Sequence, residues 1–274
     1  CGSCGKSTTV KCARCKDVYY CNAECQKAHW KEHKRICDMD RYIRRVGALL
    51  QDLFFAWAEQ MHRDCFVRIE DTGSHLIVYD GPHQQGSFYP FPNHLVKNAK
   101  DKRMILSSQM CDEALAYFKD LVDEMLKGTE CKLHEFHFRV KIPRRRTKII
   151  TVHGEDITGP LRAHLVIAVS AKDNQKEWII DPTGAQFSMF EAVMGKSEYE
   201  HRYVDKVLSH PKWGYTKKKF EAYAKERGYA GLMARISFKS MECIHQTVLS
   251  WKTAHGDLNS NLFRATDPVF QDRK

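Results

Sequence analysis

The segment RAHLVIAVSAKDNQKEWIIDPTGAQF, residues 162–187, decides the fold of the larger part of this chain. Its two runs of β-branched and aromatic residues, HLVIAVS and EWIID, flank a short polar loop, which predicts a β-hairpin. If His164 and Asp181 face each other, the turn falls between Lys172 and Asp173, inside the polar loop. Opposed side chains in an antiparallel pair have Cβ atoms about 5 Å apart. We therefore expect an imidazole and a carboxylate to lie side by side on this hairpin.

Further strands surround the hairpin. Runs with period-two alternation or a high content of β-branched and aromatic residues predict strands at 65–70, 75–80, 135–142, 148–153, 164–170 and 177–181. The turn 71–73 joins the first two strands. Pro90 and Pro92 predict a loop over residues 81–98 with room for a short helix.

Helical spacing of apolar residues predicts a helix at 38–62 and another at about 108–127. Ser107 or Ser108 is the expected N-cap of the second helix, and Gly128 is its expected stop. Later helical signals cover 188–194, 199–209, 216–227 and 238–254. Strands followed by helices are typical of an α+β fold.

Composition excludes several classes of protein. The 274 residues are 43% hydrophobic and 28% charged, which is a globular composition and excludes a disordered chain. No apolar run approaches the roughly 18 residues that span a bilayer, and no segment reads as a signal peptide. Seven of the 11 cysteines fall within residues 1–37, which indicates metal binding in a reducing compartment. We therefore expect a cytoplasmic or nuclear protein without membrane contact.

The clustered cysteines have the spacing of zinc ligands. Eight candidate ligands suit two tetrahedral sites: Cys1, Cys4, Cys12, Cys15, Cys21, Cys25, His33 and Cys37. The C-x2-C pairs suit tight turns, and ligands four residues apart lie on one face of a helical turn. Because the segment is too short to bury a core, two structural zinc ions must supply its folding free energy.

This segment resembles the MYND zinc finger, including the aromatic pair before Cys21 and Trp30 before His33. The resemblance implies interleaved sites, with Cys1, Cys4, Cys21 and Cys25 in one and Cys12, Cys15, His33 and Cys37 in the other. His29, one turn before His33, is expected to be a surface residue. MYND fingers bind peptide motifs of partner proteins or serve as structural caps, and both interpretations stay open here.

Cys111 is the candidate nucleophile. It falls in the first turn of the predicted second helix, where the helix dipole and free amides favour a thiolate, although Asp112 and Glu113 oppose this effect. A thiolate there suits covalent catalysis. The position also fits the apolar spacing of the helix, so an inert core cysteine is the alternative. Gln109 can lend its amide to an oxyanion hole beside the Cys111 N–H, or it is simply a polar residue of the first turn.

The order Cys111, His164, Asp181 completes a possible triad. A carboxylate beside an imidazole fixes its tautomer, and the other ring nitrogen can then accept a proton from a thiol. Taken singly, His164 can be an ordinary strand histidine and Asp181 a turn-capping residue before Pro182.

The triad order and the phrase Trp178-Ile179-Ile180-Asp181-Pro182-Thr183 resemble the transglutaminase-like branch of the papain-type fold, over roughly residues 100–187. The resemblance implies a nucleophile helix packed on an antiparallel sheet. It also implies acyl transfer through a thioester that forms or cleaves an amide bond. Met110 departs from the small residue that commonly precedes the family's cysteine.

These resemblances divide the chain into a MYND finger at 1–37, a linking helix at 38–62 and a transglutaminase-like α+β domain at 63–274. The formal charge of +10 falls to about +7 when seven thiolates and two zinc ions are counted. A basic protein favours an acidic partner. Two basic runs supply the charge: Arg144, Arg145, Arg146 and Lys148 with Lys141, and Lys217, Lys218 and Lys219. They are either solvated faces or contacts for the phosphates of an RNA such as tRNA.

A narrower resemblance is to fungal tRNA-dependent cyclodipeptide synthases, including those that use arginine. Such enzymes need basic surface for tRNA and a residue that can hold an aminoacyl group, so aminoacyl-tRNA would be the acyl donor. The rival hypotheses are a non-catalytic MYND adaptor with a pseudoenzyme domain, and a cysteine hydrolase that acts on peptides.

Overall fold

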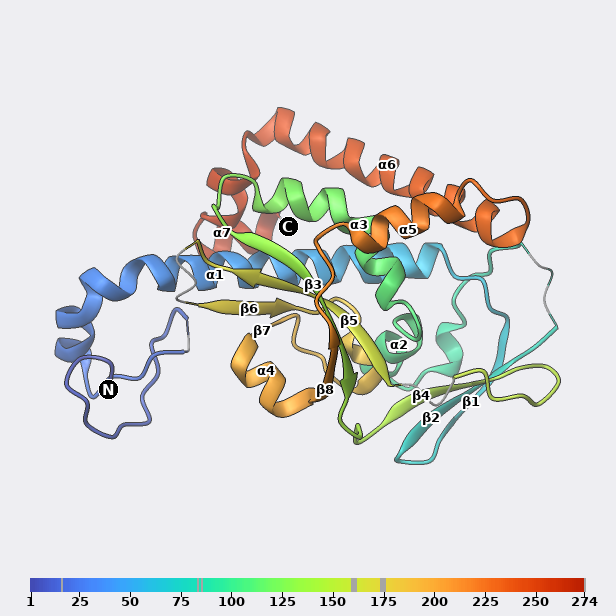
Figure 1. Ribbon diagram of the computed structural model, residues 1–274, viewed down its shortest axis with the longest axis horizontal. Helices are drawn as coiled ribbons and strands as arrows, with labels where there is room; N and C mark the ends of the chain where they lie inside the picture. Colours follow the sequence, from blue (N-terminus) through green and yellow to red (C-terminus); the bar gives the residue numbers. More distant parts are fainter. Residues whose placement is uncertain (16, 83, 85, 159–161, 173–175, 274) are drawn as a thin grey trace.

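The structure is a computed structural model that describes residues 1–15, 17–82, 84, 86–158, 162–172 and 176–273. It has an α+β architecture, with the N-terminal loops at one end of a long helix that runs through the molecule (Figure 1). The helices are α1 (Ala23–Gln60), α2 (Ala99–Leu106), α3 (Cys111–Leu126), α4 (Lys196–Tyr203), α5 (Tyr215–Tyr223), α6 (Tyr229–His255) and α7 (Asp267–Arg273). Shorter helical turns are η1 (Asn93–Leu95), η2 (Gly184–Phe187) and η3 (Asn259–Phe263).

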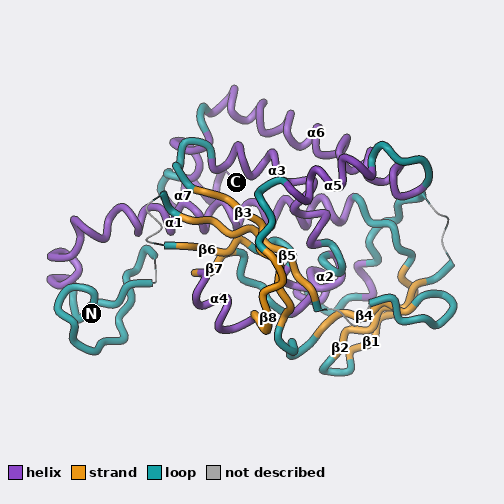
Figure 2. The backbone as a smooth tube through the Cα atoms, in the orientation of Figure 1, coloured by secondary structure: helices purple, strands orange, loops and turns teal. Residues whose placement is uncertain are grey.

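The strands form two sheets, coloured orange in Figure 2. They are β1 (Phe66–Asp71), β2 (His75–Asp80), β3 (Lys132–Val140), β4 (Arg146–Ile150), β5 (Ala163–Ser170), β6 (Glu177–Ile180), β7 (Val193–Gly195) and β8 (Val204–Ser209). The five-stranded sheet is antiparallel throughout, in the order β7-β6-β5-β3-β8. The three-stranded sheet has the order β1-β2-β4, and its β2–β4 pair is parallel.

The expected hairpin is confirmed as β5 and β6, but its register is shifted by two residues. Ile167 faces Ile180 and Ala168 faces Ile179. A shift of two keeps every side chain on its face of the sheet, so His164 and Asp181 become diagonal neighbours instead of facing each other. The expected turn between Lys172 and Asp173 falls partly on residues 173–175, which lie outside the described residues.

The five-stranded sheet separates two apolar layers. Alternate residues of β5, such as Ile167 and Val169, pack with α1 and α3 in the larger core. The other residues of β5, such as Val166 and Ala168, point to the opposite face and pack with β3 and with Tyr199 of α4 in a second cluster. Burying one such large apolar side chain stabilises the fold by about 1.5–3 kcal/mol. The sheet and α3 are therefore fixed relative to each other by their apolar faces.

Several predicted helix boundaries are wrong for local reasons. Helix α1 begins at Ala23 and not at residue 38, because the Asn22 side chain caps it by accepting the Cys25 N–H at 2.9 Å. The finger's last ligands and the predicted linking helix therefore share one helix. Helix α3 begins at Cys111, while Ser107 closes the preceding helix α2, which the sequence analysis did not predict.

The region after residue 181 departs most from expectation. Residues 188–194 contain no α-helix; η2 precedes them, and their last two residues start β7. The helix expected at 199–209 ends at Tyr203, and Val204–Ser209 form β8, which pairs with the edge of β3. Pairing with an open sheet edge satisfies backbone groups in a way that local periodicity does not reveal.

One polar cluster connects the N-terminal loops to the sheet. Lys176, just before β6, places its Nζ 2.7 Å from Asp17 and 2.9 Å from the buried Asp40 of α1. The indole N–H of Trp178 donates to the same Asp40 at 2.8 Å.

No helix among the described residues is long and apolar enough to cross a membrane.

Candidate functional site

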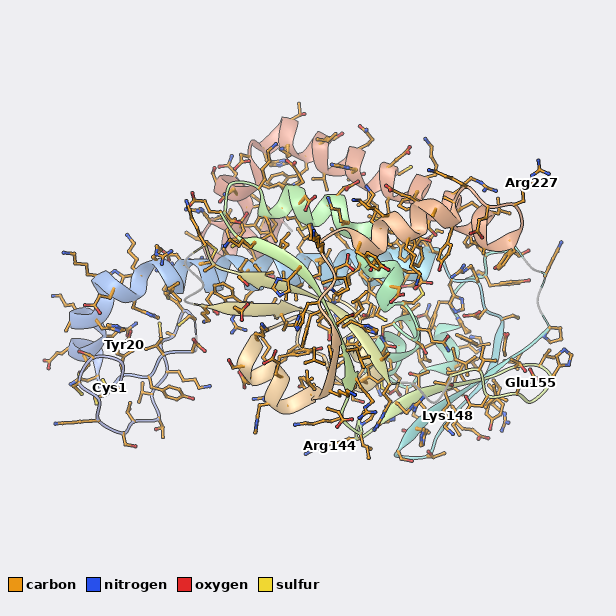
Figure 3. All side chains as sticks on the ribbon, in the orientation of Figure 1. Cys1, Tyr20, Arg144, Lys148, Glu155 and Arg227 are labelled. Atoms are coloured by element: carbon orange, nitrogen blue, oxygen red, sulfur yellow. The ribbon has the colours of Figure 1, made fainter. Side chains whose placement is uncertain are left out.

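Two groups of four cysteine and histidine ligand atoms converge in the N-terminal segment. One group is Cys1, Cys4, Cys21 and Cys25, and the other is Cys12, Cys15, His33 and Cys37; within each, the ligand atoms lie within 4.8 Å of one another. These are the two sets expected from the sequence. Figure 3 shows Cys1 and Tyr20 in these N-terminal loops, at the end of α1.

The spacing of the sulfurs fits zinc. The Cys4 sulfur lies 3.6 Å from that of Cys21 and 3.9 Å from that of Cys25. A tetrahedron with Zn–S bonds of about 2.3 Å separates its sulfurs by about 3.8 Å. In the other group, burial and the neighbouring thiolates raise the pKa of Cys37, a penalty that a bound dication would offset. The two clusters are consistent with two structural zinc ions.

A buried aromatic residue supports the second cluster. The Tyr20 ring lies edge-on to His33, with centroids 5.8 Å apart, and its hydroxyl is 2.9 Å from Nδ1 of His29. His29 is therefore half-buried against Tyr20, not a surface residue as expected, and it is not among the ligands.

The second candidate site contains a buried imidazole–carboxylate pair. Nε2 of His164 lies 3.0 Å from both carboxylate oxygens of Asp181, and both side chains are almost completely buried. An ionised carboxylate only accepts hydrogen bonds, so Nε2 carries the ring proton and Nδ1 is left as an acceptor. Nδ1 is buried without a hydrogen-bond partner among the described residues. The pair thus presents an unused proton acceptor.

Three further groups hold this pair in place. The Tyr199 hydroxyl of α4 donates to Asp181 at 2.7 Å, and the Thr183 N–H donates at 3.1 Å. The Phe187 ring lies edge-on to His164, with centroids 5.3 Å apart. Burial and the Asp181 charge raise the pKa of Tyr199, so its hydroxyl stays protonated and remains a donor. Tyr199 could not be predicted from the sequence, because no spacing rule connects it with the hairpin.

Cys111 is the first residue of α3, after the cap Met110, and it is only partly buried. Burial raises the pKa of its thiol, and the Asp112 carboxylate raises it further, while the backbone N–H of Leu165 lowers it. The thiol donates to Asp112 at 3.6 Å. Leu165 follows His164 directly, so the sulfur lies beside the strand that carries the imidazole.

The thiol and the imidazole are not joined in this structure. Since Nδ1 of His164 has no partner among the described residues, Cys111 makes no hydrogen bond to it. The structure therefore brings His164 and Asp181 together and places Cys111 beside the same strand without completing the chain of hydrogen bonds.

Cys111 lines a cavity of about 260 Å³. Gln109 and Gln186 line it as well. Gln109 has a left-handed backbone, with φ of 60°, and its N–H donates to the Gln186 side chain at 3.2 Å. Its own side-chain amide donates to the Ile157 carbonyl at 3.1 Å. The expected oxyanion donor is thus at the cavity but engaged elsewhere.

A larger cavity, of about 620 Å³, shares Phe187 with the Cys111 cavity. Three cationic residues, Lys141, Arg144 and Arg202, line it together with His201. Figure 3 shows Arg144 and Lys148 on the same side of the molecule, far from Cys1. Cationic groups therefore gather next to the Cys111 cavity.

Other members of the basic runs are engaged in ion pairs. Arg145 lies 2.6 Å from Asp101 and 3.0 Å from Asp71, and Lys217 lies 2.6 Å from Asp120. Lys148 forms an ion pair with Asp156 at 3.4 Å, and Lys219 forms one with Asp112 at 3.8 Å. Arg146 lines the Cys111 cavity. Lys218 makes no ion pair among the described residues.

Comparison with known proteins identifies the N-terminal segment. Residues 1–37 match the family model of the MYND finger. Ubiquitin carboxyl-terminal hydrolase 19 of Arabidopsis thaliana is 58% identical over 38 residues, which are 14% of this chain and 6% of that protein. Tudor domain-containing protein 1 of Mus musculus is 40% identical over 37 residues, 14% of this chain and 3% of that protein. No solved structure matches the chain.

The chain therefore spans only a small fraction of the length of these curated relatives, and each similarity is about as long as the finger. The finger is identified, and the remainder of the chain is unassigned by any of these comparisons.

Proposed function

We propose that residues 63–274 form a thiol-dependent acyl-transfer domain in which Cys111 is the nucleophile, His164 the general base and Asp181 the group that orients His164. The transglutaminase-like interpretation of the fold belongs to this proposal. The observation that carries it is that Nδ1 of His164 is buried and has no hydrogen-bond partner among the described residues. His164 directly precedes Leu165, whose backbone N–H interacts with the Cys111 sulfur.

The reaction divides into two acyl transfers. The Cys111 thiol gives its proton to Nδ1 of His164 as the sulfur attacks an activated carbonyl, and the leaving oxygen or nitrogen then takes that proton from the imidazolium. The product is a thioester on Cys111. An amine or water then attacks the thioester, His164 accepts its proton and returns it to the departing thiolate. An amine acceptor forms an amide, and water gives hydrolysis.

Two features set requirements for this chemistry. Since burial raises the pKa of Cys111, the thiol is protonated at rest and must be deprotonated within the step by His164. The Cys111 N–H at the start of α3 is one oxyanion donor. Gln109 can be the second donor only if its amide leaves the Ile157 carbonyl.

The basic cavity beside Phe187 supports an anionic acyl donor. Lys141, Arg144 and Arg202 would neutralise phosphates of a chain whose acylated end enters the Cys111 cavity. An aminoacyl-tRNA has this combination of a phosphate backbone and an activated ester. A cyclodipeptide forms if the aminoacyl group on Cys111 passes to the amine of a second aminoacyl-tRNA, and the free amine of the resulting dipeptidyl-tRNA then attacks its own ester and releases the tRNA. The finger would then cap the N-terminal end of α1 or hold a peptide motif.

Intact-protein mass spectrometry tests the acyl-enzyme. Zinc-loaded full-length protein is incubated with aminoacyl-tRNA, and an aminoacyl mass adduct is expected that is absent in Cys111→Ser and retained in Cys65→Ser. A diketopiperazine in the supernatant that disappears after RNase treatment would identify the tRNA-dependent version. An adduct that persists in Cys111→Ser contradicts the proposal.

The second candidate function is a non-catalytic adaptor. It is favoured by one observation, that Cys111 donates to Asp112 and not to His164. Alkylation by iodoacetamide separates the two candidates in zinc-loaded protein with a Cys243→Ser background, which removes the exposed thiol outside the finger. An enzyme requires Cys111 to react much faster than Cys65 and Cys131, and more slowly after His164→Ala. Equal slow labelling of all three supports the adaptor.

A further inference from the structure

A second pocket lies at the N-terminus of α3, which also contributes residues to the Cys111 cavity. Its volume is about 290 Å³, and Met110, the cap of α3, is one of its walls. Five aromatic side chains from α1, α3, α5 and α6 line it: Trp57, Tyr117, Phe220, Tyr223 and Tyr229. Tyr117 stands 5.6 Å from Trp57 and 5.3 Å from Phe220 between ring centroids. The pocket is therefore a cluster of ring faces and edges.

One carboxylate, Glu113, lines this aromatic pocket. It makes no hydrogen bond or ion pair to another side chain among the described residues, and its own backbone N–H has the largest effect among the groups that support its charge. Burial raises the pKa of Glu113 to about 7, although the residue is only partly buried. A desolvated carboxylate without a counter-ion is costly, and such groups are usually paired.

The charged groups around Glu113 do not provide that pairing. Arg63 lines the same pocket, yet it forms no ion pair with Glu113 among the described residues. Arg63 and Lys219 of α5 lower the pKa of Glu113, while its neighbour Asp112 raises it. Burial raises the pKa of Tyr117 to about 12, so this hydroxyl adds no charge to the pocket near pH 7. The unmet charge is therefore negative and sits among aromatic rings.

We propose that this pocket binds an organic cation, an alkylammonium or alkylguanidinium group, with Glu113 as its counter-ion. Aromatic faces attract cations through the ring quadrupole, and the attraction is larger at desolvated sites than at exposed ones. A carboxylate at the wall of such a pocket adds charge-assisted hydrogen bonds to the same group. The binding itself does not involve Cys111, so the proposal is independent of acyl transfer.

Calorimetric titration of the zinc-loaded full chain tests the pocket. The probes are n-butylguanidinium and n-butylammonium, and n-butylurea is the neutral isostere of the former. Both cations are expected to bind at millimolar concentration or tighter, and the urea at least tenfold more weakly. Cation affinity should rise with pH between about 6 and 8 as Glu113 ionises.

Two charge variants with opposite expected effects make the assignment specific. Glu113→Gln should weaken cation binding at least tenfold and abolish its pH dependence, whereas Arg63→Gln should strengthen it. Tyr229→Ala, at a partly exposed wall, provides a variant that leaves the core packing intact and should also weaken binding.

Equal binding of butylurea and butylguanidinium, unchanged binding in Glu113→Gln, or no saturation up to about 50 mM would each overturn the proposal. Binding that is retained in Cys111→Ser, with no acyl adduct on the wild-type protein, would support the pocket and refute the enzyme. The two proposals can therefore fail separately.

Discussion

At the residue scale, the Asp181 carboxylate accepts hydrogen bonds from more groups than the sequence motif around it predicts. It accepts from Nε2 of His164, the Tyr199 hydroxyl and the Thr183 N–H. Three donors on one buried carboxylate hold it in a single orientation, which is the purpose of the third member of a catalytic triad. The same three donors would also stabilise a purely structural core, so the orientation has to be tested by substitution.

Tyr199→Phe removes one donor without changing the packing of the ring. Because the Asp181 carboxylate then loses a hydrogen bond in a dry environment, the free energy of unfolding should fall by about 1–3 kcal/mol. Urea denaturation measures this change. Tyr203→Phe, one helical turn away on the same helix, is the matched control and should differ from wild type by less than about 0.5 kcal/mol. Equal effects of the two substitutions would contradict the assigned role of Tyr199.

Glu113 should reduce stability in a pH-dependent way. Its pKa in the folded protein is raised to about 7, above the value near 4.3 in an unfolded chain. The folded state therefore loses stability relative to the unfolded state as pH rises above about 4.3, and the loss is complete above about pH 7. Glu113→Gln should stabilise the protein, and this gain should grow by about 1 kcal/mol between pH 5.5 and pH 8 after allowance for partial solvation.

Urea denaturation at both pH values, with saturating zinc, measures the gain. A gain that is the same at pH 5.5 and pH 8 would mean that the Glu113 carboxylate titrates normally.

At the element scale, the η2 turn fits closely against the imidazole–carboxylate pair. A Cβ added at Gly184 would lie 2.3 Å from the Asp181 carboxylate and 2.8 Å from the Met189 carbonyl. Gly184→Ala must therefore displace Asp181, with a loss of about 1–3 kcal/mol in the free energy of unfolding. Gly195→Ala, where an added Cβ meets nothing within 4 Å, is the control.

The same two variants also report on the triad. If Asp181 orients His164, alkylation of Cys111 should slow in Gly184→Ala and remain unchanged in Gly195→Ala. Equal alkylation rates would show that the position of Asp181 does not matter to the thiol.

Sequence alone predicted those elements whose pattern is local. The zinc ligands and the β5–β6 hairpin follow from spacing and alternation, and both are present. The observed register of the hairpin differs from the predicted one by two residues. His164 and Asp181 still lie on one face of the sheet, because side-chain direction repeats every two residues. The predictions failed where structure depends on distant partners. Strand β8 forms because the edge of β3 is available for pairing, and Tyr199 reaches Asp181 because α4 packs against β6 and β7.

At the scale of the whole molecule, the finger and the larger domain have separate cores. The finger residues form a small cluster around its cysteines, and neither of the two large apolar clusters contains a described residue of 1–37. Ion pairs of Lys176 with Asp17 and of Arg14 with Asp38 connect the parts. Partly exposed ion pairs contribute little to stability.

Removal of zinc should therefore unfold the finger alone. Chelation at neutral pH is expected to release two equivalents of zinc and to lower the helical signal in circular dichroism as the start of α1 frays. The thermal transition of the remaining domain should persist. A loss of all tertiary signal on chelation would show that the two parts fold as one unit.

Helix α1 sets the distance between the two parts of the molecule. From Cys37, a zinc ligand, to Trp57, a wall of the aromatic pocket, it runs 20 residues without interruption, or about 30 Å. A peptide anchored at the finger would need roughly nine extended residues beyond its anchor to reach that pocket. The length of the helix therefore sets a minimum length for such a peptide. A shorter peptide that is bound at the finger cannot reach the aromatic pocket, whatever its affinity for the finger.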